Sequence, residues 1–84
     1  MTTNMEPIIE SFAAYLRVAG ASSETIRHRV GTIRRLIESG IDPATCTASD
    51  LIQWLSGFHS PATRASYRAA IRTFYHFANE FGEV

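Results

Sequence analysis

The sequence predicts an all-α domain built from four helices. Hydrophobic residues make up 45% of its 84 residues, and they recur at the three- and four-residue intervals of amphipathic helices. No run alternates polar and apolar residues with the period of a strand, and no Asn-Gly or Asp-Gly pair marks a hairpin. A chain of this length forms one domain with a single modest core.

The first two helices are each bounded by a recognisable signal. The first is expected over residues 6–19 and is closed by Gly20, because glycine readily adopts the backbone conformation that ends a helix. The second begins after Ser22, whose hydroxyl can accept a hydrogen bond from a free N–H group of the first turn. It extends to about residue 39, before Gly40.

The third and fourth helices also begin with capping signals. Thr47, with Asp50 three residues later, resembles a capping box, in which each side chain bonds to the other residue's backbone N–H. Ser60 followed by Pro61 combines a hydroxyl cap with a proline suited to the first turn. These two helices are expected over residues 48–56 and 61–80, with Gly82 as the stop of the fourth.

One apolar face on each helix is expected to form the core. Tyr75 and Phe77 lie outside that face on the fourth helix. They are therefore available to a neighbouring protomer or another domain, or are simply exposed aromatics of a small protein. The predicted core residues are Phe12 and Leu16 with Ile8 or Ile9 and Tyr15; Ile26, Val30, Ile33 and Ile37; Leu51, Ile52, Trp54 and Leu55; and Tyr67, Ala70, Ile71, Phe74, Ala78 and Phe81.

Positive charge is segregated along the chain. All eight basic residues are arginine, and seven of them lie within residues 25–37 and 60–79, which contain no acidic residue. All eight carboxylates lie outside these stretches, so a net charge of zero conceals two strongly basic segments. A partner responds to the local field of a surface and not to the sum over the chain. Nucleic acid, an ordinary solvated surface and an acidic protein partner all remain open from this pattern.

Helical projection arranges the basic residues on two faces. Like charges four residues apart oppose an isolated helix, so their stacking favours an external anion. An exposed glycine inside a helix costs about 1 kcal/mol, so Gly31 either lets a phosphate approach the backbone, serves close helix packing or reflects neutral drift. The residues of these faces are Arg27, Gly31, Arg34 and Arg35 on the second helix and Arg64, Arg68 and Arg72 on the fourth.

The openings of the second and fourth helices provide further candidate contacts. A helix N-terminus carries free N–H groups and the positive end of the helix dipole, which suit a phosphate. Hydroxyl and arginine side chains at these openings can contact phosphates and base edges in a DNA groove. They are Thr25 and Arg27 on the second helix and Thr63, Arg64 and Ser66 on the fourth.

Three helix-opening segments occur in a characteristic order: Ser-Ser-Glu-Thr-Ile at 22–26, Thr-Ala-Ser-Asp-Leu at 47–51, and the run from Ser-Pro-Ala-Thr-Arg through Thr-Phe-Tyr at 60–75. In this order they resemble the N-terminal core-binding domain of tyrosine recombinases, the SAM-like domain of phage integrases and Xer-type recombinases. The resemblance implies a compact four-helix SAM-like fold that binds double-stranded DNA at a recombination core site for DNA integration. It also implies contact with other protomers and with a C-terminal catalytic domain of the same protein, in the bacterial cytoplasm.

The resemblance places the second and fourth helices against the major groove. The family often has an aromatic residue where this chain has Arg29, which would make Arg29 a rim contact. Tyr67 lies at the edge of the predicted buried face, so packing and DNA contact both remain open for it. The matching positions are Thr25, Arg27, His28 and Gly31 on the second helix and Thr63, Arg64, Ser66 and Tyr67 on the fourth.

We expect no catalytic residue, metal or cofactor on this chain. The family's chemistry needs a nucleophilic tyrosine surrounded by arginine, lysine and histidine, and the sequence has no lysine. The three histidines lie singly on separate elements, which does not favour a metal site, and no apolar run is long enough to span a membrane. Residues 1–84 are therefore expected to be the non-catalytic domain of a longer integrase, with a helical module that binds an acidic protein partner as the alternative.

Overall fold

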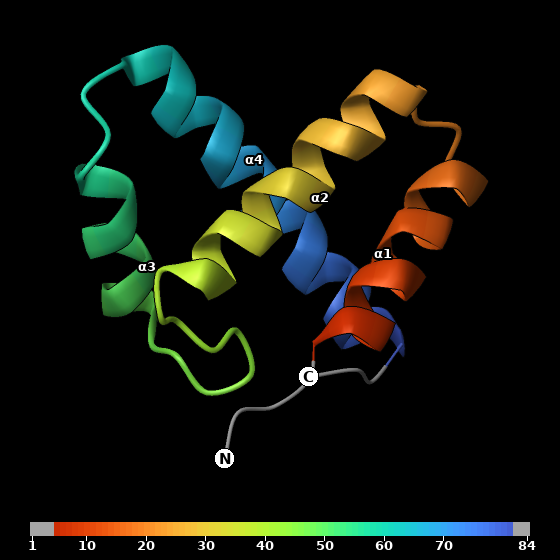
Figure 1. Ribbon diagram of the computed structural model, residues 1–84, viewed down its shortest axis with the longest axis horizontal. Coiled ribbons are helices and arrows are strands. Elements are labelled where there is room, and N and C mark those ends of the chain that lie inside the picture. The colour runs from red at the N-terminus through yellow and green to blue at the C-terminus, as the bar shows by residue number, and fades with distance from the viewer. Residues whose placement is uncertain (1–4, 82–84) are drawn as a thin grey trace.

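The computed structural model describes residues 5–81, which form four α-helices and contain no strand (Figure 1). The all-helical fold predicted from the sequence is confirmed, and each helix ends within one residue of its expected position. The expected stop at Gly82 lies outside the described residues. The helices are α1 (Glu6–Val18), α2 (Ser23–Glu38), α3 (Ala48–Ser56) and α4 (Pro61–Phe81).

Side-chain caps begin three of the helices as the sequence predicts. The Ser22 hydroxyl accepts a hydrogen bond from the N–H of Thr25 at 3.1 Å. Both halves of the capping box are present at α3, where the Thr47 hydroxyl accepts from Asp50 N–H at 3.1 Å and the Asp50 carboxylate accepts from Thr47 N–H at 2.9 Å. At α4, the Ser60 hydroxyl accepts from a first-turn N–H at 3.3 Å. Local sequence therefore determines where these helices begin.

The connections after α1 and α2 both turn at glycine. Gly20 and Gly40 have φ values of 86° and 98°, a region that side chains with a Cβ rarely enter. These two residues stop α1 and α2 at the expected points and redirect the chain.

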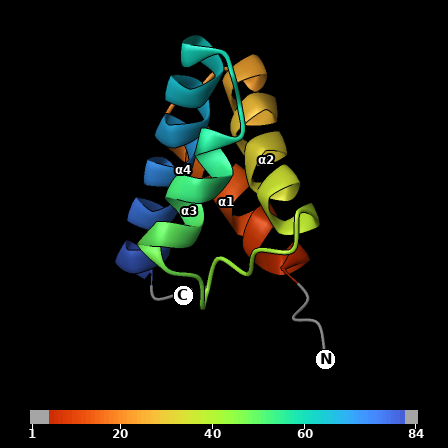
Figure 2. The same cartoon turned by 90° about the vertical axis from the view of Figure 1, so that its left-hand side faces the viewer.

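Helices α1, α2 and α4 form the core, and α3 packs beside it. α2 packs against both α1 and α4, crossing α4 in Figure 1, whereas α3 packs against α4. Figure 2 shows α3 and the loop that leads to it on one side of the molecule. The start of α2 and the start of α4 diverge from their crossing, so both openings point away from the core (Figure 1).

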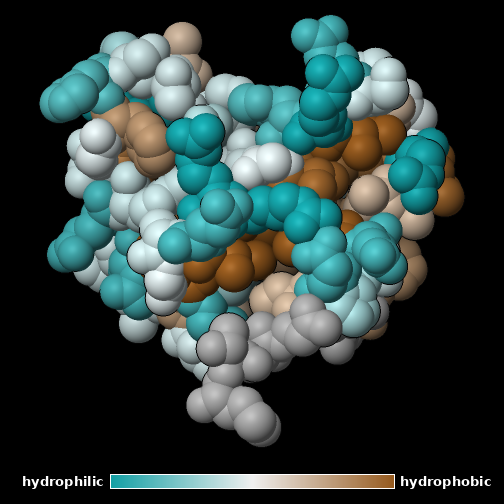
Figure 3. Space-filling model, in the orientation of Figure 1, coloured by the Kyte–Doolittle hydropathy of each residue, from teal (hydrophilic) through white to brown (hydrophobic). Residues whose placement is uncertain are grey.

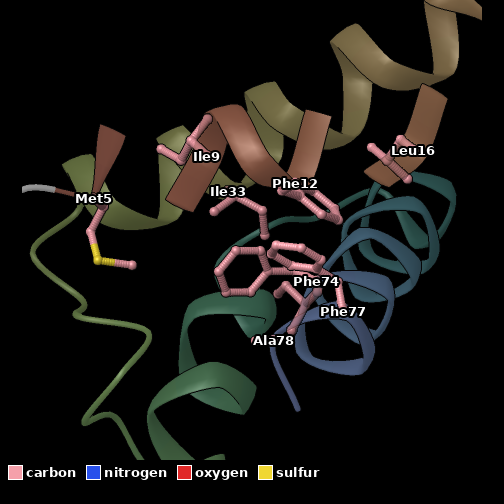
Figure 4. Packing of buried hydrophobic residues seen from close by; sticks show 9 residues of the cluster. Met5, Ile9, Phe12, Leu16, Ile33, Phe74, Phe77 and Ala78 are labelled. Atoms are coloured by element: carbon pink, nitrogen blue, oxygen red, sulfur yellow. The ribbon is translucent and has the colours of Figure 1, made fainter. Parts of the chain in front are cut away.

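Aromatic rings from α1 and α4 fill the centre of the core (Figure 4). The ring of Phe12 meets that of Phe74 edge to face, with centroids 5.2 Å apart, and lies 5.5 Å from the ring of Phe77. Ile33 of α2 is fully buried in the same cluster. Edge-to-face ring pairs add to the free energy gained by burying apolar surface.

The buried face of α2 is rotated away from the predicted one. Ile33 is buried as predicted, together with Thr32 and Leu36. The other predicted core residues, Ile26, Val30 and Ile37, are only half-buried and pack against the core. The prediction followed the centre of the apolar stripe. Because α2 lies against two helices, its deepest residues lie between the flank that meets α1 and the flank that meets α4.

The prediction was also wrong at both ends of the core. Ile52 is 66% exposed and Phe81 is 58% exposed, whereas Phe77 is buried and so is not available to another protomer or domain. Met5, which was not predicted, closes one end of the cluster. α4 is long enough to pass both α2 and α1, so its buried face widens along its length.

Within residues 5–81, no helix combines the length and apolar composition needed to cross a membrane.

Candidate nucleic-acid interface

The second turns of α2 and α4 meet at a hydrogen bond between His28 and Ser66. The ring Nε2 atom and the hydroxyl Oγ atom lie 2.5 Å apart, although the residues are 38 positions apart in sequence. Both were candidate DNA contacts on separate helices. Figure 3 shows the surface hollowed between the starts of these two helices.

A depression of about 300 Å³ lies at this junction. It brings together Thr25, His28 and Ser66, three of the residues that sequence reasoning selected. Arg29, assigned only to the rim by the family resemblance, is half-buried and lines the same depression. The complete lining is Glu24, Thr25, His28, Arg29, Ser66 and Ala69.

A second depression of about 350 Å³ adjoins the first at Ala69 and continues along α4. Arg72, Thr73 and His76 line it, so two arginines and two histidines occur along the combined surface. We call the residues lining the two depressions the α2–α4 trough. Sequence reasoning missed Thr73 and His76, because their relation to Ser66 depends on which flank of α4 is turned toward α2.

Hydroxyl groups in the trough already have local partners. The Ser22 hydroxyl donates to Thr25 Oγ1 at 3.0 Å, which leaves the Thr25 hydroxyl proton available to an incoming acceptor. Thr73 donates to the carbonyl of Ala69 at 2.9 Å. Thr25 is therefore the hydroxyl at the α2 opening that is oriented by a neighbour and still able to donate to a phosphate or base edge.

The outer face of α2 carries Arg27, Gly31 and Arg35, all exposed. A Cβ added at Gly31 would meet nothing within 4 Å, so close helix packing does not explain this glycine. Within the described part of the chain, neither Arg27 nor Arg35 has a side-chain hydrogen bond or ion pair. Their charges are therefore free to act on an external anion.

Arg34 differs from its neighbours because folding gives it an acidic partner. Its Nη1 and Nη2 atoms donate to the two carboxylate oxygens of Glu6 at 2.8 and 2.6 Å. This pairing lowers the pKa of Glu6 and raises the pKa of Arg34. Arg34 thus bridges α2 to the first turn of α1, and much of its charge is offset.

The arginine stripe of α4 divides between two flanks. Arg72 lines the α2–α4 trough, whereas Arg64 and Arg68 line a separate depression of about 440 Å³ beside α3. Ser66 and Arg68 are two residues apart, a rotation of about 200° on a helix. Arg68 therefore lies far around α4 from Ser66 but only about 40° from Arg72, which lines the trough one turn further along the helix.

Tyr67 has a packing role at the edge of this site. Its ring stacks on Trp54 of α3 with centroids 5.7 Å apart and lies 4.9 Å from the ring of Phe58. It also lies 6.0 Å from the ring of His28. Thr63 is half-buried, and its N–H is used by the Ser60 cap. Of the candidates at the α4 opening, Ser66 is thus the one placed in the trough.

Comparison with known proteins adds no relative: no family model, curated protein or solved structure matches this sequence. Within residues 5–81, no group of three or more histidine, cysteine, aspartate or glutamate side chains is placed to hold a metal ion. The assignment of the site therefore rests on its geometry and charge.

Proposed function

We propose that this chain is a DNA-binding module, the SAM-like core-binding domain of a tyrosine recombinase of the phage integrase type. It holds double-stranded DNA at the recombination site and positions a separate catalytic domain of the same protein there. The observation that carries the proposal is the His28–Ser66 contact, which joins the second turns of α2 and α4 in one polar, arginine-bearing surface.

In the proposed complex, α2 enters the major groove, which is wide enough to admit a helix. Arg27 and Arg35 on its outer face bind phosphates on one side of the groove, and Arg29 and Arg72 in the trough bind phosphates on the other. Gly31 lets the backbone approach closely between them.

Base contacts in this complex come from the junction of the two helices. Thr25 donates through its hydroxyl, and His28 and Ser66 present one polar site from two helices. Glu24 opposes phosphates, but a carboxylate can accept a hydrogen bond from the N4 amino group of cytosine. Glu24 therefore reduces binding to arbitrary DNA and favours sites with a cytosine in register.

Salt-dependent DNA binding tests the proposal. Replacing Arg27 and Arg72 together with alanine should weaken binding to all duplexes alike and reduce the slope of log affinity against log salt by about 2. Arg17→Ala is the matched control, because Arg17 is an exposed arginine on α1 outside both surfaces. Fluorescence anisotropy with labelled duplexes gives both quantities.

Amide shifts on titration with duplex DNA locate the surface independently. We expect shifts at the openings of α2 and α4, including His28 and Ser66. Shifts confined to α1, α3 and the end of α4 would contradict the proposal, as would an unchanged salt slope in the double arginine variant.

A further inference from the structure

The depression between α3 and α4 has an apolar floor that the proposed DNA contact does not use. Ile52 and Leu55 of α3 and Ala65 of α4 form this floor, within a volume of about 440 Å³. Ile52 is 66% exposed, although the sequence predicts it in the core. The remaining lining residues are Ser56, Arg64 and Arg68. We call this surface the α3–α4 depression.

Two arginines one helical turn apart border the floor. The side chain of Arg68 has no hydrogen bond or ion pair with any residue from 5 to 81. Arg64 donates from Nη1 to the carbonyl of Phe58 at 3.0 Å, which orients its guanidinium but leaves its charge unbalanced. Since like charges four residues apart on a helix oppose one another, an external anion relieves an existing cost.

An apolar floor bordered by two arginines favours a peptide over a nucleic acid as the ligand of this depression. A DNA backbone could pair with the arginines but has no aliphatic group to cover Ile52 and Leu55. An apolar side chain seated there would remove apolar surface from water, with a gain of about 25 cal/mol per Å². Forked guanidinium donors also match the two oxygens of a carboxylate.

We propose that the α3–α4 depression docks an acidic, amphipathic segment of a partner protein. Aliphatic side chains of the segment cover Ile52 and Leu55, and two of its carboxylates pair with Arg64 and Arg68. The arginines are four residues apart, so they rise about 6 Å along α4, which matches carboxylates at positions i and i+4 of a helical segment.

This interaction goes beyond the proposed DNA binding and uses the flank of α4 that lies beside α3. Arg68 and Ser66 face nearly opposite directions on the helix, and Ser66 lines the α2–α4 trough. Arg72 also lines the trough, and it lies one turn from Arg68 and about 40° around the helix, so the two surfaces are neighbours along α4.

A synthetic helical peptide provides the probe. It carries glutamates at i and i+4 and leucines at i+3 and i+7, and a second peptide replaces the glutamates with glutamines. We expect the acidic peptide to bind saturably to the whole chain, with amide shifts centred on Ile52, Leu55 and Arg68. The glutamine peptide should bind roughly tenfold more weakly, because it lacks the charge that pairs with the arginines.

Variants separate the two parts of the depression. Ile52→Ser and Arg68→Ala should each weaken the acidic peptide roughly fivefold to tenfold, since one removes apolar contact and the other an ion pair. Arg17→Ala, on α1 and outside the depression, should leave peptide affinity unchanged. Ile52 and Arg68 are both exposed, so circular dichroism should confirm that these variants remain folded.

Three outcomes overturn the docking proposal. They are no saturable binding of the acidic peptide, equal binding of the glutamine peptide, and a loss of DNA affinity with a flatter salt slope when Arg64 and Arg68 are both replaced by alanine, which would assign these arginines to phosphate. The trough proposal is judged separately by the Arg27 and Arg72 variants, so either proposal can fail without the other.

Discussion

Gly31 shows how a single residue can be explained by what surrounds it. It lies inside α2, where glycine is less favourable than alanine, and a Cβ at this position would meet nothing within 4 Å. Neither a turn nor close packing requires it. Under the proposed function, its place between Arg27 and Arg35 on the outer face of α2 gives it a use in close approach to DNA.

Gly31→Ala should therefore separate stability from binding. We expect the free energy of unfolding to rise by about 1 kcal/mol, because alanine is the better helix former at an exposed interior position. DNA affinity should fall, because the methyl group holds the backbone away from the phosphates. Urea unfolding and fluorescence anisotropy measure the two effects.

Ser11→Ala serves as the matched control for this variant. Ser11 is exposed on α1, so its replacement should also raise stability modestly without changing DNA affinity. If Gly31→Ala bound DNA as tightly as the unmodified chain, the close approach at α2 would be refuted.

Among the elements, α3 is the one with no fully buried residue. It is held by half-buried side chains, including Trp54, whose ring meets Phe58 at 4.9 Å and stacks on Tyr67. The loop before α3 is tied to α4 by Tyr75, whose hydroxyl donates to the carbonyl of Pro43 at 2.6 Å. Burial and the neighbouring Cys46 thiol raise the pKa of Tyr75, so this tie stays protonated at physiological pH.

With so little burial, α3 depends strongly on its capping box. Thr47→Ala removes the hydroxyl that accepts from Asp50 N–H and should cost about 1 kcal/mol. Hydrogen exchange should accelerate in α3 more than in α1 or α2. Ser49→Ala is the control, since Ser49 lies in the same first turn but has no side-chain hydrogen bond within residues 5–81. Uniform acceleration across all four helices would show that α3 does not open separately.

Across the whole molecule, the Glu6–Arg34 pair joins the start of α1 to the middle of α2. Pairing lowers the pKa of Glu6 below its ordinary value, so the carboxyl binds its proton less readily in the folded chain. The pair therefore stabilises the fold at neutral pH, and its contribution is lost as the pH falls through the lowered pKa. Because both groups are exposed, the contribution is modest and sensitive to salt.

Glu6→Gln should reveal this contribution as a pH-dependent difference in melting temperature. The variant should melt below the unmodified chain at neutral pH, and the two should converge in acid, where both side chains are neutral. Glu10→Gln, on the same helix, should show a smaller difference, because Glu10 acts on Arg34 through its charge but, within residues 5–81, forms no ion pair with it. A gap between Glu6→Gln and the unmodified chain that persists in acid would mean that the carboxylate charge is not the cause.

How far the sequence predicts the fold and the site depends on the range of the interaction. Ser22, Thr47 and Ser60 act on N–H groups three residues away, so local pattern was enough to place the starts of α2, α3 and α4. The core was less predictable. Ile52 was expected in the core but is exposed, and Phe77 was expected outside it but is buried, because burial depends on how the helices cross.

The sequence by itself determined four helices, their ends and the segregation of arginine, because these follow from propensity, capping and composition within a few residues. Only the tertiary structure decided where those arginines lie and which residues surround them. The packing of α2 on α4 joined His28 to Ser66, and the packing of α1 on α2 brought Glu6 to Arg34. The packing of α3 on α4 placed Arg64 and Arg68 beside α3. The physical reason is that helix packing angles and rotations are set by contacts between distant segments, which no local pattern encodes.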